Sequence, residues 1–385
     1  MTLRLLTAGE SHGPELILVL DGMPAGVRVN GEEIDHQLRR RQGGYGRGAR
    51  STKVERDHGE IVAGVAEGKT TGAPVAIRIR NLDYANQPES RPALTTPRPG
   101  HADLAGAIKY GLSDLRQVRE RASARETAAR VAAGSLVRPL LDQFGIVVGS
   151  FVTSIGAVAA ELDLARMDRD DLLAAASAAE RDSMRCADQA VSARMVRAVD
   201  EARVARETLG GTFVVFAVGL PVGLGSHTQW DRRLDTVIAG SFCSIPAVKG
   251  VEIGPAFEVS AMVGTKAQDA IVSKGERLAR ETNFAGGLEG GMTDGQPLVV
   301  RAAMKPLSSV RAPLPSVDLG TGSPSDPPYI RSDVCAVPAA AVVGEAALSL
   351  VLAGAIVERF GGDRLDAMLA SARVASGLPL EVSTL

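Results

Sequence analysis

The chain has 385 residues, 45% of them apolar and 23% charged, and its 43 Lys and Arg nearly balance its 45 Asp and Glu. These values are average for a folded soluble protein, which excludes a disordered chain, a collagen-like chain and a small disulfide scaffold. The net charge of −2 argues against a general binder of nucleic acid or of anionic membranes, because both need an excess of positive charge on one face.

Strands, turns and three helices are predicted for the first 160 residues. Asn30 is a good N-cap, and the basic run Arg39, Arg40 and Arg41 suits the last turn of the helix that follows it. The predicted elements are strands at 3–7 and 16–20, a helix at 31–42, a hairpin of 60–65 and 74–80, helices at 103–110 and 124–144, and a strand at 146–158.

Helices dominate the prediction for the rest of the chain. Gly361 and Gly362 end a long helix rich in Ala, Val and Leu, and Asp363 is the expected N-cap of the last helix. The predicted elements are helices at 168–176, 187–208, 229–239, 266–281, 338–360 and 363–374, and strands at 212–218 and 296–304. Pro-rich segments at 81–100 and 306–328 are expected to be loops.

This order of elements favours an α+β fold in which helices pack against or between antiparallel sheets. Strands and helices do not alternate as they do in a doubly wound sheet. In addition, no G-x-G-x-x-G follows a strand and opens a helix, so a Rossmann nucleotide site is disfavoured.

The first 20 residues, the longest uncharged stretch and the cysteines together predict a cytoplasmic protein. Residues 1–20 lack the apolar core of a signal peptide. The uncharged stretch 346–357, bounded by Glu345 and Glu358, is shorter than the roughly 20 residues that a membrane-spanning helix needs. Neither a disulfide framework nor a zinc site is expected, since the three cysteines are far apart and suggest buried thiols: Cys186, Cys243 and Cys335.

Two of the five histidines lie in loops dense in Gly and Pro. His12 lies in Gly-Glu-Ser-His-Gly-Pro at 9–14, and His101 lies in Arg-Pro-Gly-His-Ala-Asp at 98–103. Glycine lets the backbone approach a ligand closely, and imidazole exchanges protons near neutral pH. A histidine bonded to its local backbone is the alternative for each loop. Structural roles are assigned to the other three, His36, His58 and His227.

Arginine is the dominant cation, since only 7 of the 43 cations are Lys and 36 are Arg. Codon usage explains most of this excess, but guanidinium groups also suit carboxylate and phosphate ligands. Arg41 and Arg47 bracket a Gly-rich loop. Arg121 and Arg125 flank a helix start where free N–H groups favour phosphate. Ser123 is the expected N-cap there, with Glu126 at the spacing of a capping box.

Three more polar loops complete the pattern, at 286–295, 305–309 and 331–335. A solvated loop is the alternative for each of them. Together the loops indicate an enzyme that acts on a small, multiply anionic substrate, and no metal site is predicted.

At these residues the sequence strongly resembles the chorismate synthase family. The resemblance covers essentially the whole chain and implies a single domain over residues 1–385, a helical core between antiparallel sheets, and a cytoplasmic homotetramer. Three signature segments occur in order at 9–13, 120–127 and 331–335, with 98–103, 249–254 and 286–295 between them.

The resemblance implies the last step of the shikimate pathway to the aromatic amino acids. In that step 5-enolpyruvylshikimate 3-phosphate loses phosphate by anti-1,4 elimination to give chorismate, with reduced FMN and no net redox change. The anionic groups of substrate and FMN match the arginine-rich loops. Some relatives reduce the flavin themselves with NADPH and others rely on a separate flavin reductase, and the sequence leaves both open.

The resemblance also implies roles for individual residues. The implied substrate-binding residues are Arg41, Arg47, Arg125 and Arg331. The implied flavin-binding residues are Arg121, Ala122, Ser123, Pro246, Ala247, Gly290, Lys305, Pro306, Leu307, Ser308, Ser309 and Arg331. Many family members have Ser at the position of Ala122 and a polar residue at that of Pro246, and both are expected to contact FMN through their backbone.

Proton transfer is the implied role of five further side chains. His12 would give a proton to the departing phosphate, and His101 would stabilise or protonate the N1 side of the reduced flavin. Asp333 would be the base that keeps flavin N5 able to accept the proton from C6 of the substrate. Ser11 and Ser123 would relay protons.

Two other functions are weighed against this one. The first is a phosphotransferase or phosphatase that uses the arginine loops without flavin. The second is an RNA-binding module, but an aromatic content of 3% and the net charge of −2 argue against it.

Overall fold

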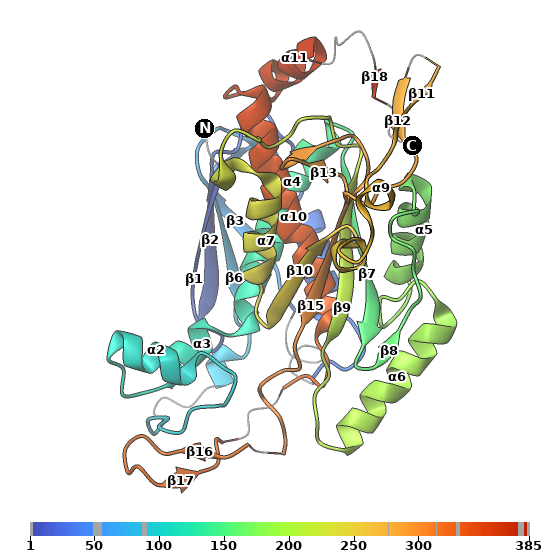
Figure 1. Cartoon of the computed structure of the whole chain (residues 1–385). Helices are drawn as coiled ribbons and strands as arrows, with labels where there is room; N and C mark the ends of the chain where they lie inside the picture. Colours follow the sequence, from blue (N-terminus) through green and yellow to red (C-terminus); the bar gives the residue numbers. More distant parts are fainter. Residues whose placement is uncertain are drawn as a thin grey trace.

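The structure is a computed structural model that describes residues 3–48, 56–86, 91–275, 277–312, 314–328, 332–375 and 381–382. Two antiparallel sheets enclose a layer of helices, as Figure 1 shows. This arrangement confirms the α+β fold class predicted from the order of the elements.

The first sheet has four antiparallel strands in the order β1-β2-β6-β3, with bounds Arg4–Ala8, Glu15–Asp21, Val75–Arg80 and Gly59–Ala63. Leu16, Leu18 and Leu20 of β2 are buried, whereas Ile17 between them is exposed. Because side chains alternate along a strand, one face of this sheet packs on the helices and the other faces outward.

The second sheet has five strands in the order β10-β15-β9-β7-β8, with bounds Val248–Ile253, Leu298–Met304, Gly211–Val218, Val147–Ile155 and Val158–Ala159. Helix α5 (Arg169–Glu180) packs on β7, and α10 (Val337–Phe360) packs on β7 and β9. Strand β9 therefore has a nearly continuous apolar run in place of alternation, as expected for a strand that is covered on both faces.

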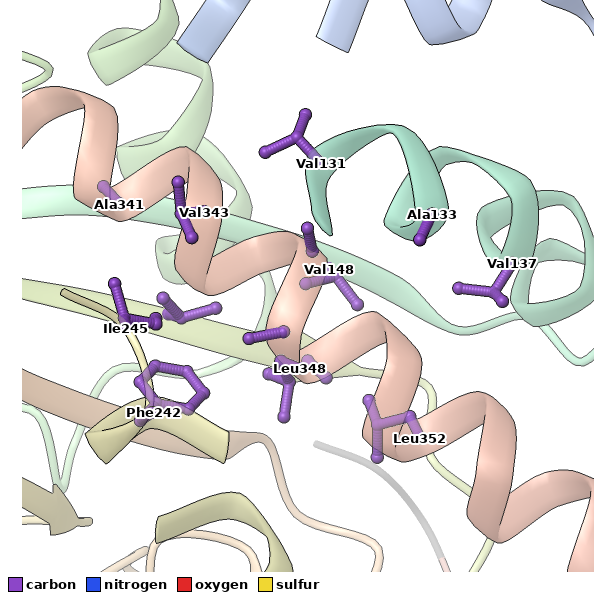
Figure 2. Packing of buried hydrophobic residues seen from close by; sticks show 14 of the residues in the cluster. Val131, Ala133, Val137, Val148, Phe242, Ile245, Ala341, Val343, Leu348 and Leu352 are labelled. Atoms are coloured by element: carbon purple, nitrogen blue, oxygen red, sulfur yellow. The ribbon is translucent and has the colours of Figure 1, made fainter. Parts of the chain in front are cut away.

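Four helices fill the space between the sheets: α1 (Gly31–Gln42), α4 (Thr127–Asp142), α7 (Leu234–Cys243) and α10. Helix α4 packs on the four-stranded sheet, α10 packs on the five-stranded one, and the two helices contact each other. Figure 2 shows side chains of four elements meeting in this core, among them Val137, Val148, Phe242 and Leu348. The predicted N-cap of α1 is confirmed, because Asn30 Oδ1 accepts a hydrogen bond from the N–H of Glu32 at 2.9 Å.

Helix α10 has 24 residues and a mean hydropathy of 2.1 over its most apolar window, so by length and composition alone it could cross a membrane. The uncharged stretch 346–357 is only half of this helix, so the argument from its length does not exclude a span. In the structure 83% of the apolar window is buried inside the protein. Burial on all sides explains why the helix is apolar all round.

Replacing Gly134 by Ala is expected to lower the free energy of unfolding by about 1–3 kcal/mol, the usual cost of overpacking. A Cβ at Gly134 of α4 would lie 2.5 Å from Cβ and 2.7 Å from Cα of Ala346 in α10, so the two helices would have to separate. The matched control is Gly240→Ala in α7, where a Cβ meets no atom within 4 Å. There the better helix propensity of Ala should stabilise the protein by roughly 0.5–1 kcal/mol. Urea unfolding of both variants checks this, and equal stabilities would contradict it.

The helix predicted at 266–281 is wrong. The described residues form a hairpin there, with strands β11 (Ile271–Lys274) and β12 (Arg277–Arg280) on either side of Gly275. Gly275 has a φ of 68°, a left-handed conformation that interrupts a helix and suits a tight turn. The β-branched residues Ile271 and Val272 before this turn favour a strand.

Other predicted boundaries also need correction. A 3₁₀ turn, η3 (Ala124–Glu126), precedes α4, and a separate helix, α3 (Arg116–Arg121), was not predicted, nor was β10. Asp363 is not at the N-cap of α11 (Leu365–Ala375), because the carbonyl of Arg364 accepts the first hydrogen bond of the helix, from the N–H of Met368 at 3.1 Å. The carbonyl of Asp363 instead accepts from the N–H of Ala25 at 2.8 Å. This backbone pairing delays the helix until residue 365.

The three cysteines are free, and Cys243 is exposed rather than buried as expected. The single domain predicted over residues 1–385 stays a prediction.

The remaining elements are β4 (Val65–Ala66), β5 (Lys69–Thr70), η2 (Tyr84–Asn86), α2 (Asp103–Tyr110), α6 (Gln189–Val204), η4 (Trp230–Arg232), α8 (Ala256–Val259), α9 (Gly264–Ala267), β13 (Leu288–Glu289), β14 (Met292–Thr293), β16 (Ser316–Val317), β17 (Pro324–Ser325) and β18 (Glu381–Val382).

Candidate active site

A six-residue helix, α3, contacts both of the predicted histidine loops. The carbonyl of Glu120 accepts a hydrogen bond from the N–H of Ser11 at 3.2 Å. One position earlier, Arg119 donates two hydrogen bonds to Asp103, at 3.2 and 3.0 Å. The structure thus brings two loops that are far apart in the sequence to one short helix, at the lower left of Figure 1.

The His12 side chain contacts a hydroxyl and a carboxylate. Its Nδ1 lies 2.9 Å from Ser11 Oγ and 3.7 Å from Glu120 Oε1. Burial raises the pKa of the Glu120 carboxyl, while the nearby Arg91 acts in the opposite direction. Because a hydroxyl both donates and accepts, Ser11 and His12 can pass a proton in either direction.

Arg121 holds the chain that leads into the first histidine loop. Its guanidinium donates to the carbonyls of Thr7 and Gly9, at 2.9 and 3.3 Å, and to Thr7 Oγ1 at 3.0 Å. Gly9 has a φ of 102°, and a Cβ there would lie 2.3 Å from the carbonyl oxygen of Glu15. Only glycine therefore fits at the start of this loop.

Ser123 is the N-cap of η3, as predicted, since its Oγ accepts a hydrogen bond from the N–H of Arg125 at 3.3 Å. The capping box predicted from the spacing is not formed. Glu126 instead accepts from Thr7 Oγ1 at 2.9 Å and pairs with Arg130 at 3.0 Å. Ala122, directly before the cap, ends α3.

Arg41 and Arg125 meet at a buried carboxylate, that of Asp57. Arg125 donates to both of its oxygens, at 2.6 and 2.7 Å, and Nη1 of Arg41 lies 3.9 Å from Oδ2. Arg41 also donates to Thr127 Oγ1 and to the carbonyl of Ala124, each at 2.9 Å. Both arginines are buried and oriented by these partners, and their substrate-binding roles stay predictions.

Asn81 links this buried carboxylate to the first histidine loop. Its Oδ1 accepts from Nε of Arg125 at 3.0 Å. Its Nδ2 donates to the carbonyls of Glu10 and Gly13, at 3.2 and 2.7 Å. One hydrogen-bonded network therefore positions both the loop and the guanidinium groups.

The Gly-rich loop after α1 delivers Arg47 to Asp333, with which it forms an ion pair. The N–H of Gly48 donates to the same carboxylate at 2.6 Å. Two residues further on, burial raises the pKa of the Cys335 thiol to about 11, which keeps it protonated at neutral pH. Arg331, predicted for both substrate and flavin, lies outside the described residues.

The second histidine loop packs against the segment that follows β15. Lys305 Nζ donates to the carbonyl of Gly100 at 2.6 Å, and Nη1 of Arg98 donates to Ser309 Oγ at 2.7 Å. His101 directly follows Gly100 in this loop and is itself mostly buried. The structure thus joins the loop that contains His101 to the predicted flavin-binding segment.

The predicted positions Pro246 and Ala247 belong to the same cluster. The carbonyl of Ala247 accepts from the N–H of Lys305 at 2.9 Å, and Ala247 has the left-handed φ of 69°. In the neighbouring segment the carbonyl of Leu307 accepts from Thr208 Oγ1 at 2.8 Å. Pro306 is exposed and Ser308 is half-buried.

Gly290 is not brought to this cluster. It lies between β13 and β14, where the next residue, Gly291, accepts a hydrogen bond from the N–H of Leu234 at the start of α7. Ala247 follows the other end of α7. Because a helix of this length spans about 15 Å, Gly290 and the Lys305 segment lie at opposite ends of it.

Four residues that hold the site were missed by the sequence analysis: Asp57, Asn81, Asp103 and Glu120. Asp103 and Glu120 are within two positions of predicted residues, and that spacing was an available signal. Asp57 and Asn81 belong to polar loops whose partners are distant in the sequence, so no local signal marked them.

The site can therefore present two imidazoles, several guanidinium groups and a lysine to an anionic ligand. In the part of the chain that the structure describes, no three His, Cys, Asp or Glu side chains are grouped as metal ligands would be.

Comparison with known proteins identifies the family of the chain. The family profile of chorismate synthase matches residues 3–357. The chorismate synthase of Rubrobacter xylanophilus is 52% identical over 374 residues, which cover 95% of this chain and 94% of the relative. That of Moorella thermoacetica is 52% identical over 373 residues, which cover 94% and 95%. A crystal structure of chorismate synthase superposes with a TM-score of 0.80 at 41% identity and covers 97% of both chains.

Fold, site and relatives together define a carbon–oxygen lyase that acts on a phosphorylated small molecule. Its product leads to the aromatic amino acids. The chain belongs to the chorismate synthase family, which confirms the resemblance read from the sequence and replaces the two alternative functions.

Proposed function

We propose that the chain converts 5-enolpyruvylshikimate 3-phosphate into chorismate and phosphate by anti-1,4 elimination, with reduced FMN and no net redox change. The observation that carries this proposal is the position of α3, which contacts both histidine loops and leads directly into the segment that contains Arg121 and Arg125. The identity of 52% to chorismate synthases over nearly the whole chain supports the same reaction.

The substrate has two carboxylates and one phosphate, which are the ligands that guanidinium groups bind best. Arg41, Arg47, Arg125 and Arg331 are the residues proposed to bind them. The carboxylate of Asp57 orients the guanidinium groups of Arg41 and Arg125, and that of Asp333 orients the guanidinium group of Arg47.

The residues around His101 fit a bound flavin. Nη1 of Arg119 is buried and has no hydrogen-bond partner among the described residues, and Lys305 adds a second cation nearby. Bound reduced FMN would supply a transient electron that helps phosphate to depart. The residues proposed to line it are Arg121, Ala122, Ser123, Pro246, Ala247, Gly290, Lys305, Pro306, Leu307, Ser308, Ser309 and Arg331.

Proton transfer is proposed for the hydroxyl and imidazole groups of the site. His12 gives a proton to the leaving phosphate, and Ser11, 2.9 Å from its Nδ1, can return one. Ser123 accepts a hydrogen bond from the backbone, which leaves its own proton available for a relay. His101 would stabilise or protonate the N1 side of a bound flavin, and Asp333 would be the base that keeps flavin N5 able to accept the proton from C6 of the substrate.

The experiment that tests this function measures phosphate release from 5-enolpyruvylshikimate 3-phosphate under anaerobic conditions, with and without reduced FMN. Release that requires reduced FMN, together with the absorbance of chorismate, supports the proposal. Equal release in both conditions would contradict it and indicate a phosphatase.

Arg47→Lys is expected to raise the KM for the substrate roughly 10-fold, because a point charge replaces a fork whose hydrogen bonds to an anion are worth about 1.5–3 kcal/mol. Steady-state kinetics with saturating reduced FMN measures this. Arg203→Lys is the matched control, since Arg203 is exposed and pairs with Asp200 on α6. An unchanged KM in Arg47→Lys would contradict the assigned role.

The remaining expectations from the family are proposed together. A homotetramer is supported by the exposed apolar residues Leu6, Ile17 and Val62 on the outer face of the four-stranded sheet. The cytoplasm is proposed as its location. Analytical ultracentrifugation tests the assembly. NADPH is proposed as the reductant of FMN, either in this protein or in a separate flavin reductase, and NADPH oxidation by the purified protein with FMN distinguishes the two.

A further inference from the structure

Asp103 is a fully buried carboxylate, with 0% of its surface exposed, at the start of α2. Its Oδ1 lies 2.5 Å from Nδ1 of His101, two residues earlier in the chain. A single contact would not compensate for the burial of this charge, because burying a charge without partners is strongly unfavourable.

Two arginines bind the other oxygen of the same carboxylate. Oδ2 accepts from Nε of Arg98 at 3.1 Å and from Nε and Nη2 of Arg119 at 3.2 and 3.0 Å. The backbone N–H of Arg98 adds a fourth hydrogen bond at 3.1 Å. Burial acts to raise the pKa of Asp103, but His101 and Arg98 outweigh it and the pKa is lowered.

We propose that Asp103 is the positioning residue of His101, holding the ring proton on Nδ1 and leaving Nε2 for the ligand. The inference rests on the proposed function, in which His101 faces the flavin. An ionised carboxylate only accepts hydrogen bonds, so the imidazole nitrogen that faces it must carry a proton in both the neutral and the protonated ring.

The two histidines of the site therefore differ in what their partners allow. Nδ1 of His12 faces the hydroxyl of Ser11, which accepts or donates and so permits either tautomer. Nδ1 of His101 faces the carboxylate of Asp103, which permits only the tautomer with a proton on Nδ1. The hydroxyl beside His12 thus allows a proton to pass in either direction, whereas the carboxylate beside His101 fixes the proton on Nδ1.

The two arginines also fix the position of the Asp103 carboxylate, because they connect it to neighbouring segments. Arg98 also donates to Ser309 Oγ at 2.7 Å, so the carboxylate, the ring and the Lys305 segment form one connected unit. Arg119 comes from α3, the helix that contacts the first histidine loop. Asp103 is thereby held at the meeting point of the two loops and the segment after β15.

The first test uses the wild-type protein without substrate or flavin. Selective ¹⁵N labelling of its five histidines, with His101 assigned by a His101→Gln variant, reports the tautomer of each ring above pH 8. The expected spectrum has Nδ1 protonated and Nε2 unprotonated at His101. A ring protonated at Nε2 would overturn the proposal, whatever the activity of the protein.

The second test is Asp103→Asn. The arginines need an acceptor at the position of Oδ2, so the amide oxygen should face them and the amide nitrogen should face His101. The ring must then accept at Nδ1 and carry its proton on Nε2, which reverses the tautomer. We expect kcat to fall by at least roughly 10²-fold, with a much smaller change in KM for the substrate.

Asp114→Asn is the matched control. Asp114 lies just before α3 and accepts hydrogen bonds from the N–H groups of Leu94 and Arg116. Among the described residues no hydrogen bond or ion pair joins it to a histidine. It should leave both kcat and the His101 spectrum unchanged. A full rate in Asp103→Asn, or an unaltered tautomer in a folded Asp103→Asn protein, would overturn the proposal.

Failure of the proposed function would give a different set of results from failure of the Asp103 proposal. If the wild type shows Nδ1 protonated at His101 but releases no phosphate with reduced FMN, the reaction assignment is wrong and the placement of the proton stands. If Asp103→Asn does not fold, the wild-type spectrum alone decides the proposal.

Discussion

Asp333→Asn is expected to lower the rate of phosphate release by at least roughly 10²-fold, the usual scale for a general acid–base group. The carboxylate accepts from Arg47 and from the N–H of Gly48, so both of its oxygens are already oriented by donors. An amide at this position has one acceptor and one donor end, and the donor end must face a donor. The variant therefore loses the charge needed to accept a proton and also disturbs the position of Arg47.

Single-turnover phosphate release under anaerobic conditions measures this rate apart from product release. Asp200→Asn is the matched control, because Asp200 accepts from the hydroxyl of Tyr45 in the same Gly-rich loop but belongs to α6. Its rate should stay within roughly 3-fold of the wild type, since surface substitutions have small effects. A wild-type rate in Asp333→Asn would show that another group is the base.

Glu345→Gln is expected to lower the free energy of unfolding by about 3–5 kcal/mol, the usual cost of removing one partner from a buried ion pair. Glu345 of α10 is 2% exposed and accepts from Arg40 at 2.7 and 2.9 Å and from Ser150 Oγ at 2.6 Å. Arg138 and Arg185 lie 3.0 and 3.3 Å from the same carboxylate. The amide would leave Arg40 and Arg185 with Glu180 as their acidic partner and would take from Arg138 the carboxylate with which it pairs.

Urea unfolding at neutral pH measures the loss, with Glu358→Gln on the same helix as the control. Glu358 is exposed and pairs with the exposed Arg232 at 2.7 Å, so its loss should amount to about 0–1 kcal/mol. Similar losses in the two variants would mean that the buried network adds no stability beyond a surface pair.

The same network predicts how stability depends on pH. Burial acts to raise the pKa of Glu345, but Arg40, Arg138 and Arg185 outweigh it and lower the pKa from 4.5 to about 2. The native carboxyl thus binds its proton less readily than the unfolded one, so the stabilisation is fully present above pH 4.5 and is lost as the pH falls through about 2. The free energy of unfolding of Glu345→Gln should fall less over this range than that of the wild type, and parallel curves would contradict the assignment.

Local signals made much of the fold predictable from the sequence. The alternation of Leu16, Leu18 and Leu20 marks a strand with one buried face, and Asn30 marks the start of α1. Long-range pairing explains the failures. Asp363 has the chemistry of an N-cap, but its backbone pairs with Ala25, and no property of its neighbours in the sequence announces that contact.

The sequence by itself determined the family and the loops of the site, because its Gly-, His- and Arg-containing motifs are contiguous and depend on few neighbours. Only the tertiary structure decided what each charged side chain does. Arg40 and Arg41 are adjacent and chemically identical, yet Arg40 neutralises Glu345 in the core while Arg41 turns to Asp57 near the first histidine loop. The role of an ion is set by its partners and its burial, and both arise from packing between segments that are far apart in the chain.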